Sequence, residues 1–277
     1  MTNRDRALEM LQRASILEKE AYALLSSADE VEKTERLDGV AVKALAKMEL
    51  KTGSLILGQY RVCTTLGSHV YLVKDLKTED ILLIKVANQL KDSVRNGYWI
   101  VEQLQAIEGI PKAIDIVSQN GNLFAIYNYI PGESLDRTRP LDSFGVVMGI
   151  CDAVSLVHEK GFIHKDIKPS NILIDMDGKI HLIDFDIAQK LDENNQAEVV
   201  MPEGTPRYAP PEAYKKGSIL TFSYDVYSIG IIAKEILGDN EVIQKATNKN
   251  PEQRYQTVKE FQTDLWKVFS KTKGETT

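Results

Sequence analysis

Hydrophobic residues recur at helical spacing through roughly the first fifty residues of the chain. Leu8, Leu11, Leu17 and Leu24 belong to a stripe with an apolar residue every three or four positions. This spacing places them on one face and predicts an amphipathic helix, followed by a shorter helix from about Leu37 to Leu50. Two interpretations stay open: a helical pair that packs on the following domain, or a hairpin that binds a partner or dimerises.

The pattern changes at Leu55, where short apolar runs alternate with turn residues. These runs predict strands at residues 60–66, 70–73, 81–86, 113–118 and 123–127. Helical spacing returns once within this region, at about residues 91–108. A Pro-Gly pair at residues 131–132 then marks a break.

Beyond this break the apolar spacing predicts helices at residues 142–160, 223–237, 241–247 and 257–270. Two β-like runs, Ile172–Ile174 and Lys179–Ile183, flank an Asp-Gly pair that indicates a hairpin. The predicted fold class is therefore α+β and bilobal. A domain over residues 55–270 divides into a small β-rich N-lobe (about 55–130) and a larger helical C-lobe (about 131–270), preceded by an N-terminal helical segment at residues 1–51.

The composition excludes several classes of protein. The 277 residues carry a formal net charge of −6, whereas a general nucleic-acid binder is usually basic, so we expect no nucleic-acid partner. No apolar run reaches the roughly 20 residues that span a bilayer, and the charged start of the sequence is unlike a signal peptide. Two cysteines are too few for a disulfide framework. These features predict a cytoplasmic protein without a membrane partner.

The densest group of chemically useful side chains follows the predicted helix at residues 142–160. Residues 164–171 read HKDIKPSN and include Asp166, Lys168 and Asn171, and the predicted hairpin returns the chain to Asp184. A base, a cation, an amide and a second carboxylate held close together suit metal-dependent phosphoryl transfer.

Six motifs in order make the chain resemble the eukaryotic-type (Hanks-type) serine/threonine protein kinases, with the compact size of a microbial member. They are LLIK ending at Lys85, HKDIKPSN, DFD from Asp184, GTPRYAPPE at residues 204–212, DVYSIG from Asp225 and NPEQR ending at Arg254. A single such motif is weak evidence, but an ordered set with family-like spacing is strong. The resemblance extends from about Tyr60 to Lys267 and implies the bilobal kinase fold.

The resemblance implies catalytic roles for five residues. Asp166 corresponds to the base that accepts the proton of the substrate hydroxyl, and Lys168 to the cation that neutralises the transferred phosphoryl group. Asn171 and Asp184 would hold Mg²⁺, with Mn²⁺ as the alternative ion. Lys85 would bind the α- and β-phosphates of ATP. The implied substrate is a serine or threonine of another protein.

The resemblance also implies which residues meet the nucleotide. Besides Lys85 they are Gly67, Val70, Leu83, Tyr127, Asn128, Tyr129, Ile130 and Leu173. Within this set, Tyr127 takes the gatekeeper position, residues 128–130 form the hinge and Leu173 forms the floor under the adenine. Other matched residues are expected to be structural. They are the Glu212–Arg254 ion pair, Asp225, which bonds to the catalytic-loop backbone, and His164, a packed core histidine.

The N-lobe departs from the family pattern in three places. The phosphate-binding loop keeps only Gly67 of three glycines and is several residues short, which leaves fewer backbone N–H groups for phosphates. Leu83 replaces the usual small residue above the adenine. Glu102 is the candidate partner of Lys85. The helical register equally allows Ile100 or Val101 at the position of the family's glutamate.

The C-lobe departures concern regulation. Lys165 replaces the catalytic-loop arginine, and Asp186 replaces the glycine of DFG, where a side chain restricts backbone rotation. Residues 184–204 contain no Ser, Thr or Tyr, so we predict that phosphorylation of this segment is not the switch. Its acidic residues either replace a phosphate in part or form an ordinary solvated loop. They are Asp192, Glu193, Glu198 and Glu203.

Three functions stay open from the sequence. The first is an active serine/threonine protein kinase that uses Mg-ATP, which the complete catalytic set favours. The second is a pseudokinase or binding module that acts through the N-terminal helices, which the shortened phosphate loop favours. The third is a small-molecule kinase, because only residues 238–240 separate two predicted helices where the family usually has a docking helix for proteins.

Overall fold

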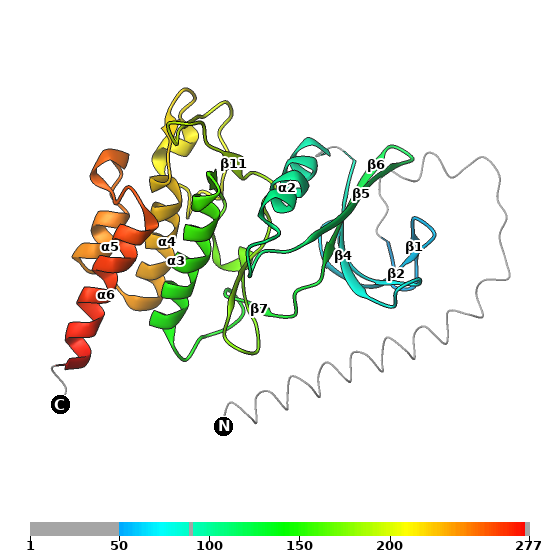
Figure 1. Ribbon diagram of the computed structural model, residues 1–277, viewed down its shortest axis with the longest axis horizontal. Helices are drawn as coiled ribbons and strands as arrows, with labels where there is room; N and C mark the ends of the chain where they lie inside the picture. Colours follow the sequence, from blue (N-terminus) through cyan, green and yellow to red (C-terminus); the bar gives the residue numbers. More distant parts are fainter. Residues whose placement is uncertain (1–49, 89–90, 275–277) are drawn as a thin grey trace. The chain divides into compact units, whose positions relative to one another are not determined.

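The computed structural model of the chain describes residues 50–88 and 91–274. These residues form two compact units (Figure 1). The first unit contains residues 50–88 and 114–129, and the second contains residues 91–113 and 130–274. The two predicted N-terminal helices lie outside the described residues, and the predicted domain boundaries stay predictions.

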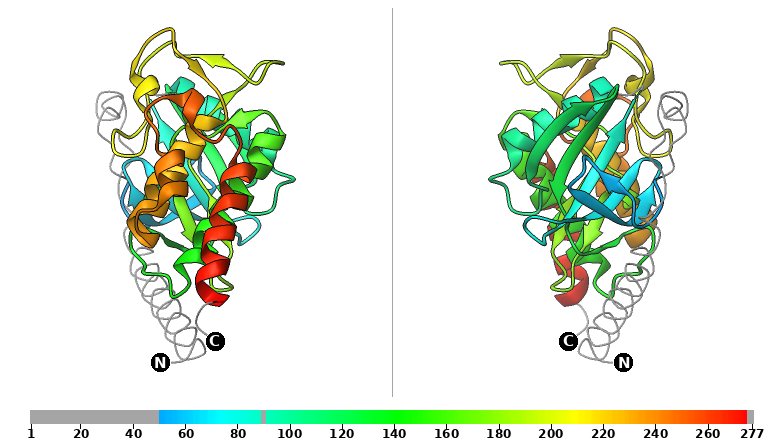
Figure 2. Two further views of the ribbon diagram at one scale, coloured as in Figure 1. Left: turned by 90° about the vertical axis from the view of Figure 1, so that its left-hand side faces the viewer. Right: turned by 90° about the vertical axis from the view of Figure 1, so that its right-hand side faces the viewer.

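A six-stranded sheet makes up the first unit. In sheet order the strands are β1 (Leu55–Ile56), β2 (Tyr60–Gly67), β3 (Val70–Asp75), β4 (Ile81–Ala87), β6 (Asn122–Asn128) and β5 (Ala113–Gln119). The view at the right of Figure 2 shows β1 and β2 (blue) on one side of this sheet and β5 and β6 (green) on the other. All five predicted strands are present, and β1 is an additional strand that the apolar pattern did not indicate.

Tight turns fix the register of this sheet. Ser68 and His69 alone connect β2 to β3, because Gly67 pairs with Val70 across the hairpin. Asn120 and Gly121 connect β5 to β6, and both have positive φ, 49° and 78°. An Asn-Gly pair tolerates this conformation, which matches the twist of the flanking strands.

Strand alternation gives the sheet an apolar face. Tyr71, Ile84 and Ile126 lie opposite one another on neighbouring strands and are at most 2% exposed. With residues of β1 and β2 they form one hydrophobic cluster, against which Leu50 and Leu57 pack. Burial of these side chains is the main stabilising contribution in the unit.

Helices dominate the second unit. They are α2 (Lys91–Leu104), α3 (Ser143–Glu159), α4 (Ser223–Leu237), α5 (Glu241–Ala246) and α6 (Val258–Gly274). In Figure 1, α3, α4, α5 and α6 pack side by side. Over the described ranges, no helix has both the length and the apolar character needed to cross a membrane.

Short strands connect these helices. A three-stranded sheet has the order β10 (Ile180–Leu182), β9 (Ile172–Ile174), β7 (Glu133–Ser134). Two two-stranded pairs join β8 (Phe162–Ile163) to β11 (Gln189–Lys190), and β12 (Ala197–Glu198) to β13 (Ile219–Leu220). The β9–β10 hairpin confirms the one that the Asp-Gly pair predicted.

Helix α2 ends at Leu104, so the predicted end near residue 108 is wrong. The N–H of Ile107 donates to the carbonyl of Leu104 at 2.8 Å, which tightens the chain into a turn. Gly109 then takes a φ of 92°, and its carbonyl accepts the N–H of Leu182, at the end of β10. A side chain at Gly109 would place its Cβ 2.8 Å from the carbonyl oxygen of Ile180. This tertiary contact, rather than helix propensity, sets the helix end.

A buried ion pair connects two segments of the second unit. Two guanidinium nitrogens of Arg254 donate to the two carboxylate oxygens of Glu212, at 2.5 and 2.8 Å. The Arg254 side chain is 0% exposed and also donates to the backbone carbonyls of Asn248 and Lys249. The predicted pair is therefore confirmed, and its charges are fully compensated.

We predict that Glu212→Gln lowers the free energy of unfolding by about 3–5 kcal/mol, because it leaves the buried guanidinium of Arg254 without a counter-charge. Urea unfolding measures the loss. The matched control is Glu235→Gln, which breaks the pair with Arg207, a residue whose side chain is 70% exposed. That change should cost less than about 1 kcal/mol. Equal losses in the two variants would contradict the prediction.

Candidate active site

A buried carboxylate fixes the backbone of the HKDIKPSN loop. Asp225, in the first turn of α4, is 0% exposed. Its Oδ2 lies 2.8 Å from Nε2 of His158 and accepts the N–H of His164, and its Oδ1 accepts the N–H of Lys165 at 3.0 Å. Burial alone would raise the pKa of Asp225, but these bonds and the nearby histidines hold that pKa below its ordinary value. The predicted role of Asp225 is confirmed.

His164 is a packed core residue, as predicted. Its Nδ1 lies 3.3 Å from the N–H of Asp166, and its Nε2 lies 3.2 Å from the carbonyl of Ile183. Only the neutral ring with its proton on Nε2 satisfies both contacts, since Nδ1 must accept and Nε2 must donate. Burial lowers the pKa of His164, which favours this neutral form. The ring therefore connects the loop to the chain just before Asp184.

Three side chains meet at the carboxylate of Asp166. Lys168 Nζ lies 2.6 Å from Oδ2, and Asn171 Nδ2 donates to the same oxygen at 2.9 Å. The hydroxyl of Thr205 donates to Oδ1 at 2.7 Å, and Lys168 Nζ also donates to that hydroxyl at 3.1 Å. Asp166 thus has one oxygen held by a lysine and an amide donor and one oxygen that accepts a hydrogen bond from a hydroxyl.

The β9–β10 hairpin brings Asp184 next to Asn171. The N–H of Ile183 donates to the backbone carbonyl of Asn171 at 3.0 Å, so the residue before Asp184 is bonded to the catalytic loop. Asp184 has a φ of 68°, an uncommon conformation for a non-glycine residue that occurs at functional sites. The side-chain N–H of Asn171 donates a hydrogen bond to Asp166. The amide oxygen of Asn171 is therefore the atom that would hold a cation. An amide oxygen and a carboxylate suit Mg²⁺.

The first unit presents four of the predicted nucleotide-binding residues on one face of its sheet. Lys85 lies opposite Val70 of β3, and Leu83 lies opposite Tyr127 of β6. Successive side chains of a strand point to opposite faces, so residues 83 and 85 and their partners share a face. The other predicted nucleotide contacts lie at strand ends or in the second unit. Gly67 is the last residue of β2, Asn128 is the last residue of β6 and residues 129–130 follow β6. Leu173 lies in β9 of the second unit.

The candidate partner of Lys85 lies on an exposed part of helix α2. Glu102 is exposed, whereas Ile100, Val101 and Leu104 are buried. The burial agrees with the predicted orientation of Leu104 toward the core. The pairing of Glu102 with Lys85 stays a prediction.

Helix α2 also contacts the DFD motif, through two residues that sequence reasoning missed. Asn96 Nδ2 donates to the carbonyls of Asp186 and Ala188, at 3.3 and 2.9 Å. A Cβ added to Gly97 would lie 2.5 Å from Oδ1 of Asp186. The absence of a side chain at Gly97 therefore gives room to the Asp186 side chain. A glycine inside a predicted helix was the available signal, because it commonly marks a packing requirement.

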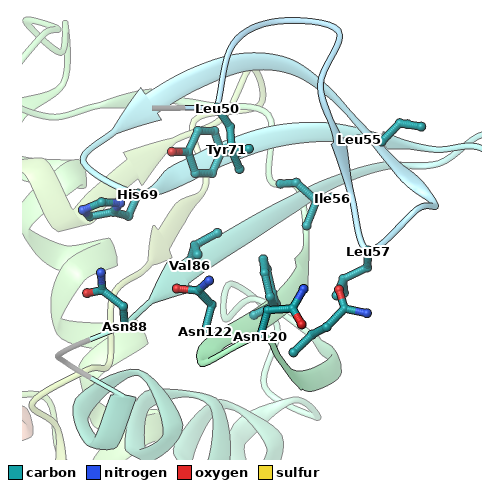
Figure 3. Close-up of a pocket in the computed structure, with 12 residues that line it drawn as sticks. Leu50, Leu55, Ile56, Leu57, His69, Tyr71, Val86, Asn88, Asn120 and Asn122 are labelled. Atoms are coloured by element: carbon teal, nitrogen blue, oxygen red, sulfur yellow. The ribbon is translucent and has the colours of Figure 1, made fainter. Parts of the chain in front are cut away.

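A pocket of about 190 Å³ lies on the opposite face of the first unit's sheet from Lys85 (Figure 3). Tyr71, Val86 and Phe124 line it from the strands, and Leu50 and Leu57 line it from the chain before β2. Its polar lining includes the amides of Asn88, Gln119, Asn120 and Asn122. No sequence pattern indicated this pocket, because Leu50 and β1 contribute to it through tertiary packing.

Comparisons with known proteins agree with this geometry. A family model described as the protein kinase domain matches residues 62–275. The serine/threonine-protein kinase PknB of Mycobacterium tuberculosis is 30% identical over 279 residues, covering 80% of this chain and 44% of the relative. PrkC of Bacillus subtilis is 24% identical over 270 residues (78% and 41%), and RUNKEL of Arabidopsis thaliana is 29% identical over 191 residues (65% and 14%). The chain therefore spans less than half the length of each of these serine/threonine-protein kinases.

We predict that His164 makes stability fall as the pH drops below about 6.5. The unfolded chain then binds a proton that the folded chain excludes, so up to about 1.4 kcal/mol is lost per pH unit. In His164→Phe this contribution to the slope should disappear between about pH 5 and 6.5, whatever the absolute stability. Denaturant unfolding across this range measures the slope. The wild-type protein, unfolded at the same pH values, is the reference. An unchanged slope in His164→Phe would contradict the prediction.

Proposed function

Because the chain belongs to the protein kinase family, we propose that it transfers the γ-phosphoryl group of ATP, with Mg²⁺, to serine or threonine side chains of proteins. One observation carries the proposal: the Thr205 hydroxyl donates to Oδ1 of Asp166 while Lys168 contacts both groups. A substrate hydroxyl would need the same acceptor, and the relatives compared above are named serine/threonine-protein kinases.

The chain's own residues divide the work. Asp166 Oδ1 accepts the proton of the attacking hydroxyl, and the donors on Oδ2 keep the carboxylate oriented. Lys168 places positive charge beside the hydroxyl oxygen. Asn171 and Asp184 would hold Mg²⁺, and Lys85 would hold phosphates. Mg-ATP, when bound, supplies the phosphoryl group and the leaving group.

The proposal includes a reduced phosphate-binding loop. Ser68 and His69 alone connect β2 to β3, so this hairpin offers few backbone N–H groups to a nucleotide. We expect the affinity for ATP to be lower than a longer glycine-rich loop would provide. Switching by phosphorylation of residues 184–204 is not part of the proposal, because that segment contains no Ser, Thr or Tyr.

The same short hairpin favours a second candidate, a pseudokinase or binding module. In that case the N-terminal residues 1–51 would bind a partner or dimerise. The pocket in Figure 3 supports this candidate, because Leu50, which continues the N-terminal segment, lines it. The third candidate, a small-molecule kinase, is supported by the three residues that separate α4 from α5.

We predict that Asp166→Asn lowers phosphoryl transfer about 10²–10⁴-fold, because the amide cannot accept the hydroxyl proton. Transfer from labelled ATP with Mg²⁺ or Mn²⁺, to the protein itself and to a generic protein substrate, measures the loss. Asp177→Asn, in the exposed turn of the β9–β10 hairpin, removes the same charge and should leave transfer unchanged.

Thermal unfolding with ATP and metal separates the candidates, because a ligand that binds only the folded state must raise Tm. The kinase proposal expects both a metal-dependent rise in Tm and transfer that depends on Asp166. A rise in Tm without Asp166-dependent transfer would overturn it in favour of the binding module. Transfer to a small hydroxyl compound, with none to protein, would favour the third candidate.

A further inference from the structure

The side chain of Lys165 is buried against the segment that follows the DFD motif. It is only 10% exposed. Its Nζ lies 2.9 Å from Oε2 of Glu203 and donates to Oε1 of Gln189 at 3.2 Å. Glu203 thus provides the carboxylate that balances this ammonium. A buried ammonium without such a partner would be unfavourable.

Glu203 lies two residues before Thr205, whose hydroxyl reaches Asp166. Lys165 and Asp166 are consecutive in the catalytic loop, and they hold residues 203 and 205 of the segment. Gly204, between them, has a φ of 109°, and an added Cβ would lie 2.7 Å from the hydroxyl of Tyr224 and 2.9 Å from Cβ of Ala209. The chain therefore passes Gly204 in close contact with its neighbours, with a side-chain bond to the catalytic loop on each side.

The remainder of the segment is held at two other points. Gln189 lies in β11, which pairs with β8 next to the catalytic loop. Ala197 and Glu198 form β12, which pairs with β13. Residues 200–202 are exposed, so the Lys165–Glu203 ion pair is the first side-chain attachment after them. It lies directly before Gly204 and Thr205 in the chain.

We propose that Glu203 is a positioning residue: its carboxylate, paired with Lys165, holds Gly204 and Thr205 against Asp166 without any covalent modification of the segment. This rests on the proposed kinase function. The carboxylate is a permanent part of the chain, whereas a phosphate would need a hydroxyl that residues 184–204 lack. The segment is therefore held in its working position as soon as the chain is folded.

The ion pair acts on geometry rather than on nucleotide binding. The hydrogen bonds that hold the Asp166 carboxylate come from Lys168, Asn171 and Thr205, whereas Glu203 is bonded to Lys165. Loss of the ion pair would let the Thr205 backbone move away from Asp166. The Thr205 hydroxyl would then be misaligned with the Asp166 carboxylate. The expected signature is a reduced kcat with an unchanged KM for ATP.

The test compares Glu203→Gln with Glu193→Gln in the full chain. Glu193 lies exposed in the same segment, so both variants remove one negative charge of equal size. We expect Glu203→Gln to lower kcat at least about tenfold at unchanged KM for ATP, and Glu193→Gln to leave both unchanged. Glu203→Asp keeps the charge on a shorter side chain and should recover part of the loss. Wild-type protein treated with phosphatase should keep its activity. Equal kcat in the two glutamine variants, or activity lost on phosphatase treatment, would overturn the proposal.

Hydrogen exchange gives a readout that does not depend on activity. The N–H groups of Tyr208 and Ala209 both donate to the carbonyl of Thr205, at 2.9 and 2.8 Å. Glu203→Gln should raise the exchange rates of these two amides at least about tenfold, and Glu193→Gln should not. If wild-type protein transfers no phosphate, the proposed function fails while this measurement still tests the ion pair. Unchanged exchange in Glu203→Gln would overturn the positioning role.

Discussion

The carboxylate of Asp225 is the constraint on which the geometry of the catalytic loop depends. It lies at the N-terminus of α4, where a negative charge is favourable, and receives N–H groups from the loop itself. Lys165 has a φ of 66°, a conformation that persists only when its surroundings enforce it. From this anchor three consecutive residues extend to two different segments. His164 reaches Ile183, whereas Lys165 and Asp166 reach Glu203 and Thr205 of the segment that follows the DFD motif. One buried group therefore aligns the chain after the β9–β10 hairpin, the segment that follows the DFD motif and the backbone of Asp166.

Three buried ionisable groups of the second unit, Asp225, His164 and Arg254, each have specific hydrogen-bond partners. Asp225 stays ionised through donated N–H groups, and His164 stays neutral because one ring nitrogen accepts and the other donates. Arg254 uses a carboxylate and backbone carbonyls together. A buried polar network that is fully bonded specifies one arrangement, whereas removal of one member leaves a desolvated group behind. Asp225 and His164 bond to the backbone of the loop that contains Asp166, so their own partners help to fix its position.

The parts predicted from sequence were those set by local pattern. The run Ser223–Leu237 was predicted as a helix with these same bounds, and the Asp-Gly turn located the hairpin that carries Asp184. Motif order then predicted that Asp166, Lys168 and Asn171 lie close together, and their side chains do meet. The end of α2 at Leu104 could not be predicted, since it depends on a backbone bond between Gly109 and Leu182. Contacts between distant positions leave no periodic signal in the chain.

Two departures from the family pattern are compensated by contacts of this kind. Asp186, in place of glycine, has its side chain accommodated where Gly97 has none, and Lys165, in place of arginine, is balanced by Glu203. Each change was visible in the sequence, but its compensating residue was not. Glu203 lies 38 positions after Lys165, and Gly97 lies in helix α2, far from Asp186 in the chain. The short turn between Gly67 and Val70 is different in kind, because it removes backbone N–H groups rather than exchanging one side chain for another. The consequence we propose for it concerns nucleotide affinity, while the contacts among Asp166, Lys168 and Thr205 lie within the second unit.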